Sequence, residues 1–254
     1  MQEVSVIIPN FNGMAYLDGV LAGLECQTVD DFEVILVDNG SSDGSCAFVA
    51  ARYPWVHLIE LPENFGFCKA VNEGIRASRS PYVLLLNNDI EVTDNFIEEM
   101  TDAIKRHPKA FSCAARMIQF HDRDRLDDAG NYYCALGWAY ARGKGKDIHT
   151  YEKEEKIFAS CAGAAIYRKK ILEKIGYFDE EHFAYLEDID IGYRARIFGY
   201  QNGYCPDAIV YHAGSGASGS RYNAFKVDLS SRNSIYLIYK NMPLLQLILN
   251  LPFF

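Results

Sequence analysis

Over the first 107 residues, short apolar runs alternate with segments in which apolar residues recur every three or four positions. The runs predict buried strands, and the recurring positions predict helices that pack one face against a sheet. Strands are predicted at Val4–Ile8, Phe32–Val37, Val56–Leu61 and Tyr82–Leu86, with Pro9 ending the first, and helices around residues 14–24, 46–52, 67–75 and 94–106. Four strand–helix repeats predict an α/β fold with a mostly parallel central sheet flanked by helices.

The second half of the chain is less regular. Strands are predicted at Phe111–Ile118, at Ile157–Tyr167 with close backbone contacts around Gly163, and in a run ending at Val210–His212. Helices are predicted at Lys169–Ile175, stopped by Gly176, and at Leu186–Phe198, followed by Gly199. His121–Asp147 is polar and is expected to be partly mobile, and Ala213–Ser220 is a flexible Gly/Ser loop. No repeat or linker divides the chain, which favours one domain.

Polar clusters follow each of the four predicted strands in the first half, at residues 9–12, 38–43, 64–66 and 87–89. Because open α/β sheets bind ligands beyond the carboxyl ends of their strands, these clusters should gather along one binding edge. A polar cluster such as Asn87–Asp89 at the exit of a buried strand is costly unless it is paired. Asp89 is therefore expected to meet a divalent cation that carries a diphosphate; alternatively, Asn87–Asp89 only caps the strand and starts a turn.

Two further groups of residues carry candidate chemistry. Glu187 and Asp188 open a predicted helix, where acidic residues also stabilise the helix dipole. One of these carboxylates is a candidate general base that takes a proton from an attacking hydroxyl. His212 ends an apolar strand, as Asp89 does. With Asp89 it would suit Mn²⁺, a carboxylate with water and phosphate oxygens would suit Mg²⁺, and a satisfied polar histidine is the alternative.

Composition excludes several classes of protein. The 254 residues allow one large α/β domain or two small ones, and 49% hydrophobic residues allow a sizeable core. The formal net charge of -9 argues against a general nucleic-acid binder. Seven cysteines without a CxxC pair argue against a zinc ribbon or thioredoxin motif and fit buried thiols in a reducing cytosol. The N-terminal stretch MQEVSVIIPN lacks the basic and apolar regions of a secretory signal.

Several motifs together resemble the family 2 glycosyltransferases over about the first 215 residues. They are PNFNG (Pro9–Gly13), VDNGSSDGS (Val37–Ser45), ENFGFCKAVNEG (Glu63–Gly74), LNNDIEV (Leu86–Val92), GAAIYRK (Gly163–Lys169), FAYLEDIDIGYRARIFGY (Phe183–Tyr200) and Val210-Tyr211-His212. Each motif alone is weakly specific, whereas the ordered set is highly specific. The LNND form and Asp128-Ala129-Gly130 resemble the rhamnosyltransferase-like subgroup.

The resemblance implies a GT-A fold in residues 1–220, with a nucleotide-binding half at about 1–107 fused to an acceptor-binding half at about 108–220. It implies an inverting transferase that uses a nucleotide sugar and Mg²⁺ or Mn²⁺. By position, Asp188 would be the base with Glu187 beside it; Asp89 and His212 would hold the metal; Pro9, Asn10, Phe11, Asp38, Asn64, Gly66, Asn88 and Gly163 would bind the nucleotide sugar. One departure from the family's DXD-type motif is Asn87 in place of the first Asp, so the metal should bind weakly without nucleotide.

The C-terminal segment 221–254 is expected to be helical. Met242–Phe254 is mostly apolar but shorter than a spanning helix, and Arg221, Lys226, Arg232 and Lys240 precede it. It either packs on the domain or lies in a membrane interface, which would place a cytoplasmic enzyme at the inner face of the cell membrane.

On the subgroup resemblance, the expected reaction moves L-rhamnose from dTDP-rhamnose to a saccharide or lipid-linked saccharide in cell-surface polysaccharide synthesis. A UDP-sugar donor and a nucleotide-sugar-binding module without transfer activity are the alternatives.

Overall fold

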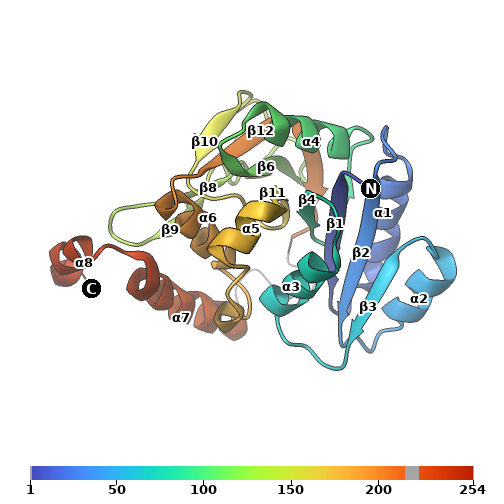
Figure 1. The fold of residues 1–254 in the computed structure, drawn as a ribbon, viewed down its shortest axis with the longest axis horizontal. Coiled ribbons are helices and arrows are strands. Elements are labelled where there is room, and N and C mark those ends of the chain that lie inside the picture. The colour runs from blue at the N-terminus through green and yellow to red at the C-terminus, as the bar shows by residue number, and fades with distance from the viewer. Residues whose placement is uncertain (1, 215–222, 254) are drawn as a thin grey trace.

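A computed structural model describes residues 2–214 and 223–253. Ten strands form one mixed sheet with the order β10-β12-β6-β11-β4-β1-β2-β3, in which β5 also pairs with β12 and β7 with β6 (Figure 1). The strands are β1 (Val4–Asn10), β2 (Phe32–Asn39), β3 (His57–Leu61), β4 (Tyr82–Leu86), β5 (Ile90–Val92), β6 (Ala110–Gln119), β7 (Leu126–Asp128), β10 (Glu155–Ile157), β11 (Ala164–Arg168) and β12 (Gln201–His212). A separate hairpin joins β8 (Asn131–Tyr133) to β9 (Ala139–Ala141).

Helices cover both faces of this sheet, as predicted. They are α1 (Met14–Glu25), α2 (Ser45–Arg52), α3 (Phe67–Ala77), α4 (Phe96–Arg106), α5 (Lys169–Ile175), α6 (Glu187–Ile197), α7 (Ala224–Asn241) and α8 (Leu244–Asn250), with short 3-10 turns at Glu180–His182 and Leu251–Phe253. Apolar side chains of α1, α2 and α4 form a core with one face, and those of α3, α5 and α6 form a second core with the other. Each predicted helix before residue 200 is present within two residues of its predicted start.

Parallel pairing is confined to two parts of the sheet. The strands β4, β1, β2 and β3 are mutually parallel, and β12 runs parallel to β6. Between them, β11 pairs antiparallel with both β4 and β6. The α/β fold with its large central sheet is therefore confirmed, and β11 joins the two predicted halves into one continuous sheet.

Pro9 does not end the first strand, contrary to the prediction. β1 continues to Asn10, with Pro9 opposite Val37 and Asn10 opposite Asp38 in β2. On its other side, β1 pairs with β4 only as far as Ile7. Pro9 therefore lies where the strand is paired on one side, and proline is tolerated at such an edge position because its missing N–H costs no ladder bond.

The apolar stretch at 157–167 was predicted as one strand and is two. β10 lies at the far edge of the sheet beside β12, whereas β11 lies at the centre beside β4. The link between them is buried, and the Gly163 carbonyl accepts from the Asn87 N–H (2.8 Å). A Cβ at Gly163 would lie 3.1 Å from Asn87 Nδ2, so the predicted close backbone contact is present. Periodicity cannot separate one buried strand from two strands joined by a buried crossing.

The polar segment 121–147, expected to be partly mobile, contains β7, β8 and β9. Arg142 explains part of this order, because its side chain is fully buried and forms an ion pair with Glu155. Its guanidinium lies 4.1 Å from the ring centroid of Tyr151 and 4.8 Å from that of Tyr204. Such cation–π contacts fix a polar segment that has little apolar surface of its own.

The C-terminal helices α7 and α8 reach away from the body of the molecule (Figure 1). α7 is attached through buried residues on one side, among them Asn233 and Leu237, and Leu237 packs on Ile189 of α6. The predicted Gly/Ser loop at Ala213–Ser220 lies, from residue 215 onward, outside the described residues. Within the described ranges, no helix combines the length and apolar character that crossing a bilayer requires.

Candidate active site

A cavity of about 860 Å³ lies where β1 and β4 end and both halves of the chain meet. It is lined by eleven of the twelve residues assigned from sequence: Pro9, Asn10, Phe11, Asn64, Gly66, Asn88, Asp89, Gly163, Glu187, Asp188 and His212. Asp38 lies behind this wall and is 2% exposed. Residues up to 203 positions apart in sequence, Pro9 and His212, thus face one space. The predicted convergence of Asp89, His212 and Asp188 on a single cavity is present.

The polar clusters after the first strands form a hydrogen-bonded edge. Asn10 Nδ2 donates to Asp38 Oδ1 (2.8 Å), and Asn10 Oδ1 accepts from Asn88 Nδ2 (2.8 Å). Farther along the edge, Asn39 Nδ2 donates to Asn64 Oδ1 (2.9 Å) and to the Gly66 carbonyl (3.0 Å). Because Asn10 is held on both sides, its place in the cavity wall is fixed before any ligand binds.

Asp89 and His212 are brought together by strand pairing. β5 and β12 are antiparallel with Ile90 opposite His212, and the Ala213 N–H donates to the Asp89 carbonyl (3.0 Å). This register places His212 Nε2 3.3 Å from Asp89 Oδ1. The other ring nitrogen, Nδ1, lies 2.8 Å from Asp127 Oδ2. Imidazole backed by a carboxylate is the usual arrangement of a metal-binding histidine, so the donor set fits a divalent cation between Asp89 and His212.

Asp127 is a site residue that sequence reasoning missed. The motif recognised in the sequence was the neighbouring Asp128-Ala129-Gly130, but it is Asp127 that contacts His212. Asp127 also forms an ion pair with Lys144 Nζ (2.6 Å). Burial alone would lower the pKa of His212, but its hydrogen bonds to Asp127 and Asp89 outweigh burial and raise that pKa to about 9. Burial would raise the pKa of Asp127, yet the same bond lowers it to about 2. A cation at this site would therefore compete with a proton on His212.

The two acidic residues that begin α6 have different surroundings. Asp188 Oδ1 accepts from the Ile189 N–H (2.7 Å) and Asp188 Oδ2 accepts from Asn131 Nδ2 (2.9 Å). Glu187 Oε2 is buried without a hydrogen-bond partner among the described residues. Burial raises the pKa of both carboxyls, and for Glu187 the neighbouring charge of Asp188 adds to this rise. Backbone donors also stabilise ionised Glu187, but only through its other oxygen, whereas both oxygens of Asp188 accept hydrogen bonds. Asp188 is therefore the better proton acceptor, and Glu187 favours its neutral form.

Asn131 is the second residue that sequence reasoning missed. It lies in β8, lines the cavity and directly follows the Asp-Ala-Gly motif at 128–130. Its backbone pairs with Ala159, which leaves the side-chain amide free to reach Asp188. The Asp-Ala-Gly motif pointed to this region of the chain. It could not show that Asn131 contacts Asp188, because Asp188 lies 57 residues further along the chain.

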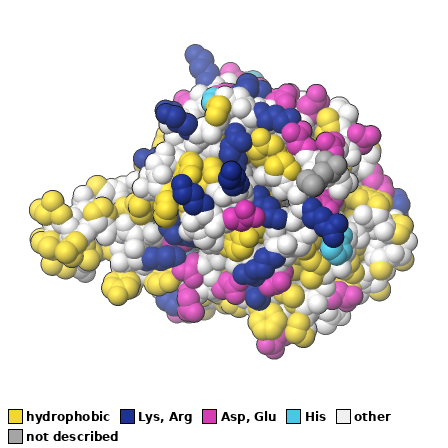
Figure 2. Space-filling model, in the orientation of Figure 1, with side chains coloured by type: hydrophobic (Ala, Val, Ile, Leu, Met, Phe, Trp, Pro, Cys, Tyr) yellow, Lys and Arg dark blue, Asp and Glu magenta, His cyan; other side chains and the backbone are white. Residues whose placement is uncertain are grey.

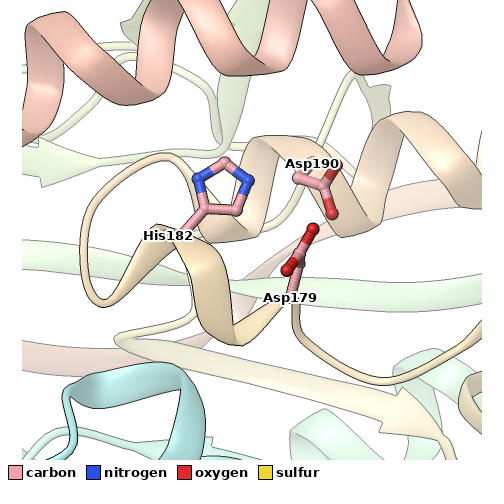
Figure 3. A group of neighbouring side chains, drawn as sticks. All are labelled: Asp179, His182 and Asp190. Carbon is pink, nitrogen blue, oxygen red and sulfur yellow. The ribbon is translucent and has the colours of Figure 1, made fainter.

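A second acidic cluster lies outside this cavity. Ligand atoms of Asp179, His182 and Asp190 lie within 4.8 Å of one another (Figure 3). However, Lys240 Nζ of α7 lies 2.5 Å from Asp179 Oδ2 and 3.0 Å from the Asp190 carboxylate, and Arg194 Nε lies 2.9 Å from Asp190. Lysine and arginine therefore already supply the cations that these carboxylates need. We interpret the cluster as an ion-pair network that attaches α7 to α6.

Comparison with known proteins identifies the family. A family model described as glycosyl transferase family 2 matches residues 5–176. The chain belongs to this family. It is therefore a glycosyltransferase, as its motifs indicated. The chain is 27% identical over 230 residues to an N-acetylglucosaminyl-diphospho-decaprenol L-rhamnosyltransferase of Mycobacterium tuberculosis, a match that covers 82% of this chain and 75% of that one.

Solved structures agree on the fold. A structure of GalNAc-T7 with UDP, GalNAc and Mn²⁺ superposes with a TM-score of 0.74 at 15% identity, covering 94% of this chain and 48% of that one. A mannosyltransferase from Pyrobaculum calidifontis in complex with GDP-Man and Mn²⁺ gives 0.62 at 18% identity, covering 83% and 56%. The glycosyltransferase thus spans about half the length of these two chains. The similarity confirms the predicted GT-A fold.

Proposed function

We propose that this glycosyltransferase is an inverting, metal-assisted enzyme that moves a sugar from a nucleoside-diphosphate sugar to an acceptor hydroxyl. The observation that carries the proposal is the meeting of Asp89, His212 and Asp188 in one cavity. The nucleotide would lie along the edge of β1, β2 and β4, with its base near the Pro9–Phe11 turn and Asp38 behind it. Asn64, Gly66, Asn88 and Gly163 would line the sugar-diphosphate part of the cavity.

The proposed chemistry needs one proton acceptor and one site for negative charge. Asp188 takes the proton of the acceptor hydroxyl as its oxygen forms a bond to the anomeric carbon, on the face opposite the diphosphate. The bond from that carbon to the diphosphate oxygen breaks, which inverts the configuration. Mg²⁺ or Mn²⁺, held by Asp89 and His212, would neutralise charge that develops on the leaving diphosphate. With Asn87 replacing the first acidic residue of the motif, the diphosphate must supply further oxygen ligands.

The donor and acceptor are proposed from the relative of Mycobacterium tuberculosis, whose name describes L-rhamnose transfer to a lipid-linked N-acetylglucosamine. On this basis we propose dTDP-rhamnose as donor and a lipid-linked saccharide of cell-surface polysaccharide synthesis as acceptor. A UDP-sugar donor is the competing proposal, because the structurally similar GalNAc-T7 was solved with UDP, GalNAc and Mn²⁺. A nucleotide-sugar-binding module without transfer is disfavoured, since Asp89, Asp188 and His212 are all present.

Contact with a membrane surface would bring the enzyme to such an acceptor at the inner face of the cell membrane. Apolar side chains gather at the end of the molecule formed by α8 (Figure 2). Leu244, Leu245, Ile248 and Leu249 are 53–71% exposed, although Asn250 fastens the same helix to the Ala135 carbonyl (2.7 Å). The helix therefore packs on the domain through one side and presents an apolar side outward, as an interfacial helix does.

Ligand binding and one substitution test the enzymatic proposal. Since ligands that bind the native state raise its melting temperature, dTDP or UDP with Mn²⁺ or Mg²⁺ should raise the Tm, and the larger shift identifies the nucleobase. Asp188→Asn should retain that shift and lose transfer, whereas Asp207→Asn, at an exposed position of β12, should retain both. Normal turnover by Asp188→Asn would remove Asp188 from the role of base.

Vesicle binding tests the membrane proposal separately. Wild-type protein should float with vesicles of phosphatidylglycerol and phosphatidylethanolamine. Leu245→Glu with Ile248→Glu should abolish flotation, because each charge would have to enter the apolar boundary. Ile197→Glu, which changes a 61% exposed isoleucine at the end of α6, is the matched control and should float. Equal flotation of all three proteins would refute docking through α8.

A further inference from the structure

The segment that leads into Glu187 and Asp188 has an unusual backbone. Phe183, Tyr185 and Leu186 have φ angles of 60°, 70° and 64°, although none of them is glycine. Residues 183–186 also line the cavity. Non-glycine residues adopt this region rarely, and backbone strain of this kind is maintained only where surrounding contacts over-determine it. Other parts of the structure must therefore hold the backbone of residues 183–186 in this conformation.

The hydrogen bonds to the backbone carbonyls of this segment show which residue holds it. Asn233 Nδ2, on α7, donates to the carbonyls of His182 (2.9 Å), Ala184 (2.9 Å) and Tyr185 (2.8 Å). The remaining two carbonyls are held by backbone donors, since Phe183 accepts from the Cys68 N–H (3.2 Å) and Leu186 from the Asp190 N–H (3.0 Å). The two hydrogens of this amide are thus shared among three of the five carbonyls from 182 to 186, and the His182 carbonyl also accepts from Arg232 Nη2 and from the Ala184 N–H.

Asn233 is itself fixed. Its side chain is fully buried, and its Oδ1 accepts from Arg232 Nε (3.1 Å). Arg232 Nη2 donates in turn to the carbonyls of Glu181 (2.6 Å) and His182 (3.2 Å). Arg232 and Asn233 therefore bind backbone carbonyls from Glu181 to Tyr185, just before α6 begins at Glu187. Both residues lie beyond the region 5–176 that the family model matches.

We propose that Asn233 is a positioning residue for glycosyl transfer, which holds the strained segment 183–186 so that Asp188 faces the cavity. The inference rests on the proposed role of Asp188 as the base. Without the amide, the carbonyls of Ala184 and Tyr185 lose their side-chain donor, and the segment can relax toward ordinary φ angles. Since Leu186 directly precedes the first turn of α6, that relaxation would move Glu187 and Asp188 away from the acceptor hydroxyl.

The test compares two buried asparagines on the same helix. Asn233→Ala should lower kcat by about 100-fold, because a displacement near 1 Å at a reacting group costs about that factor, while the Kd for nucleoside diphosphate stays within about threefold. Asn241→Ala is the matched control: Asn241 is 7% exposed, donates to Asp190 Oδ1 (2.7 Å) and makes no hydrogen bond to residues 182–186. It should lower the Tm to a similar extent and keep kcat within about twofold.

Each other outcome overturns the proposal. A wild-type kcat in Asn233→Ala, with only a lower Tm, would make Asn233 a stabilising residue alone. Equal losses of kcat in Asn233→Ala and Asn241→Ala would assign the effect to the docking of α7 in general. Loss of nucleotide binding together with kcat would show that the segment serves the donor and not the base. The role of Asp188 as the base is tested separately: normal turnover by Asp188→Asn would show that this role is wrong.

Discussion

The hydrogen bond from Asn131 to Asp188 makes the pH dependence of transfer a sensitive measure of the site. In the proposed mechanism Asp188 must be ionised to act as the base, so kcat/KM should fall on the acid side as this carboxyl takes up a proton. Burial raises the pKa of Asp188, and the Asn131 amide opposes that rise by donating to the ionised form across 2.9 Å. Asn131→Ala removes the opposing donor. The pKa should therefore rise further, and the acid limb should move to higher pH.

The size of this shift follows from the strength of the bond. A hydrogen bond to a charged group contributes about 1.5–3 kcal/mol, and one pKa unit corresponds to about 1.4 kcal/mol. Asp188 keeps its backbone donors and is partly exposed to the cavity, which favours the lower end. We expect the acid limb to move up by about one pH unit. Well above the limb, the rate should change less, because Asp188 is then ionised in both proteins.

Among the groups around Asp188, Glu187 titrates together with it, because burial and the charge of Asp188 raise the pKa of Glu187. The test therefore depends on the difference between the wild-type protein and the variant, not on the position of either limb alone. Glu187, Asp128, Cys161 and Tyr167 interact with it electrostatically, and burial raises the pKa of each, which favours their neutral forms.

The assay is nucleoside diphosphate release as a function of pH, with kcat/KM fitted at each pH. Asn131→Asp should move the acid limb at least as far as Asn131→Ala, because it adds a like charge beside Asp188. Tyr133→Phe is the control for disturbance of the hairpin, since the Tyr133 hydroxyl is buried without a hydrogen-bond partner in the part of the chain that the structure describes. Its limb should stay in place. A limb that stays in place or moves to lower pH in Asn131→Ala would refute the reasoning.

Three further predictions concern the carboxylate that contacts His212, the cavity wall and the attachment of α7. Asp127→Asn should weaken Mn²⁺ binding in the presence of nucleoside diphosphate by about 10–100-fold, measured by electron paramagnetic resonance, because it removes the carboxylate behind His212. Gly66→Ala should lower both the Tm and nucleotide affinity, since φ is 89° there and a Cβ would lie 2.6 Å from the Phe183 carbonyl oxygen. Lys240→Met should cost about 2 kcal/mol, near 4–8 °C in Tm by calorimetry, because it leaves two acidic side chains without their shared cation; an unchanged Tm would contradict that.

The sequence predicted the part of the site that local pattern determines. Strand ends are visible as apolar runs that stop at polar residues, and the carboxyl ends of parallel strands meet at one edge. Asn10, Asp38 and Asn88 could therefore be placed together before their hydrogen bonds were known. Asp89 and His212 also end apolar runs. Their meeting needed only that both runs be strands of the same sheet, which the register of β5 and β12 provides.

The residues that were missed depend on contacts that no local pattern encodes. Asp127 reaches His212 because β7 pairs antiparallel with β6 through an irregular register, and a three-residue strand in a polar segment has too little periodicity to detect. Asn131 and Asn233 act through partners 57 and 48–51 residues away. The sequence around an asparagine in a helix or hairpin does not show which distant carbonyl or carboxylate its side chain contacts. These contacts can therefore be seen only in the folded structure.

The energetics of the strained segment explain why a remote helix has to take part in the site. Residues held in sparsely populated backbone regions cost of order 1–3 kcal/mol each, so Phe183, Tyr185 and Leu186 together require about 3–9 kcal/mol. A typical hydrogen bond contributes about 0.5–1.5 kcal/mol net, so the three bonds of Asn233 offset at most about half of the larger figure. The bond from the Cys68 N–H to the Phe183 carbonyl and the bonds from Arg232 Nη2 to the Glu181 and His182 carbonyls contribute to the remainder. The segment before Asp188 is thus held by α3 and α7 together, so on the proposed mechanism both the N-terminal part of the chain and the C-terminal helix position the base.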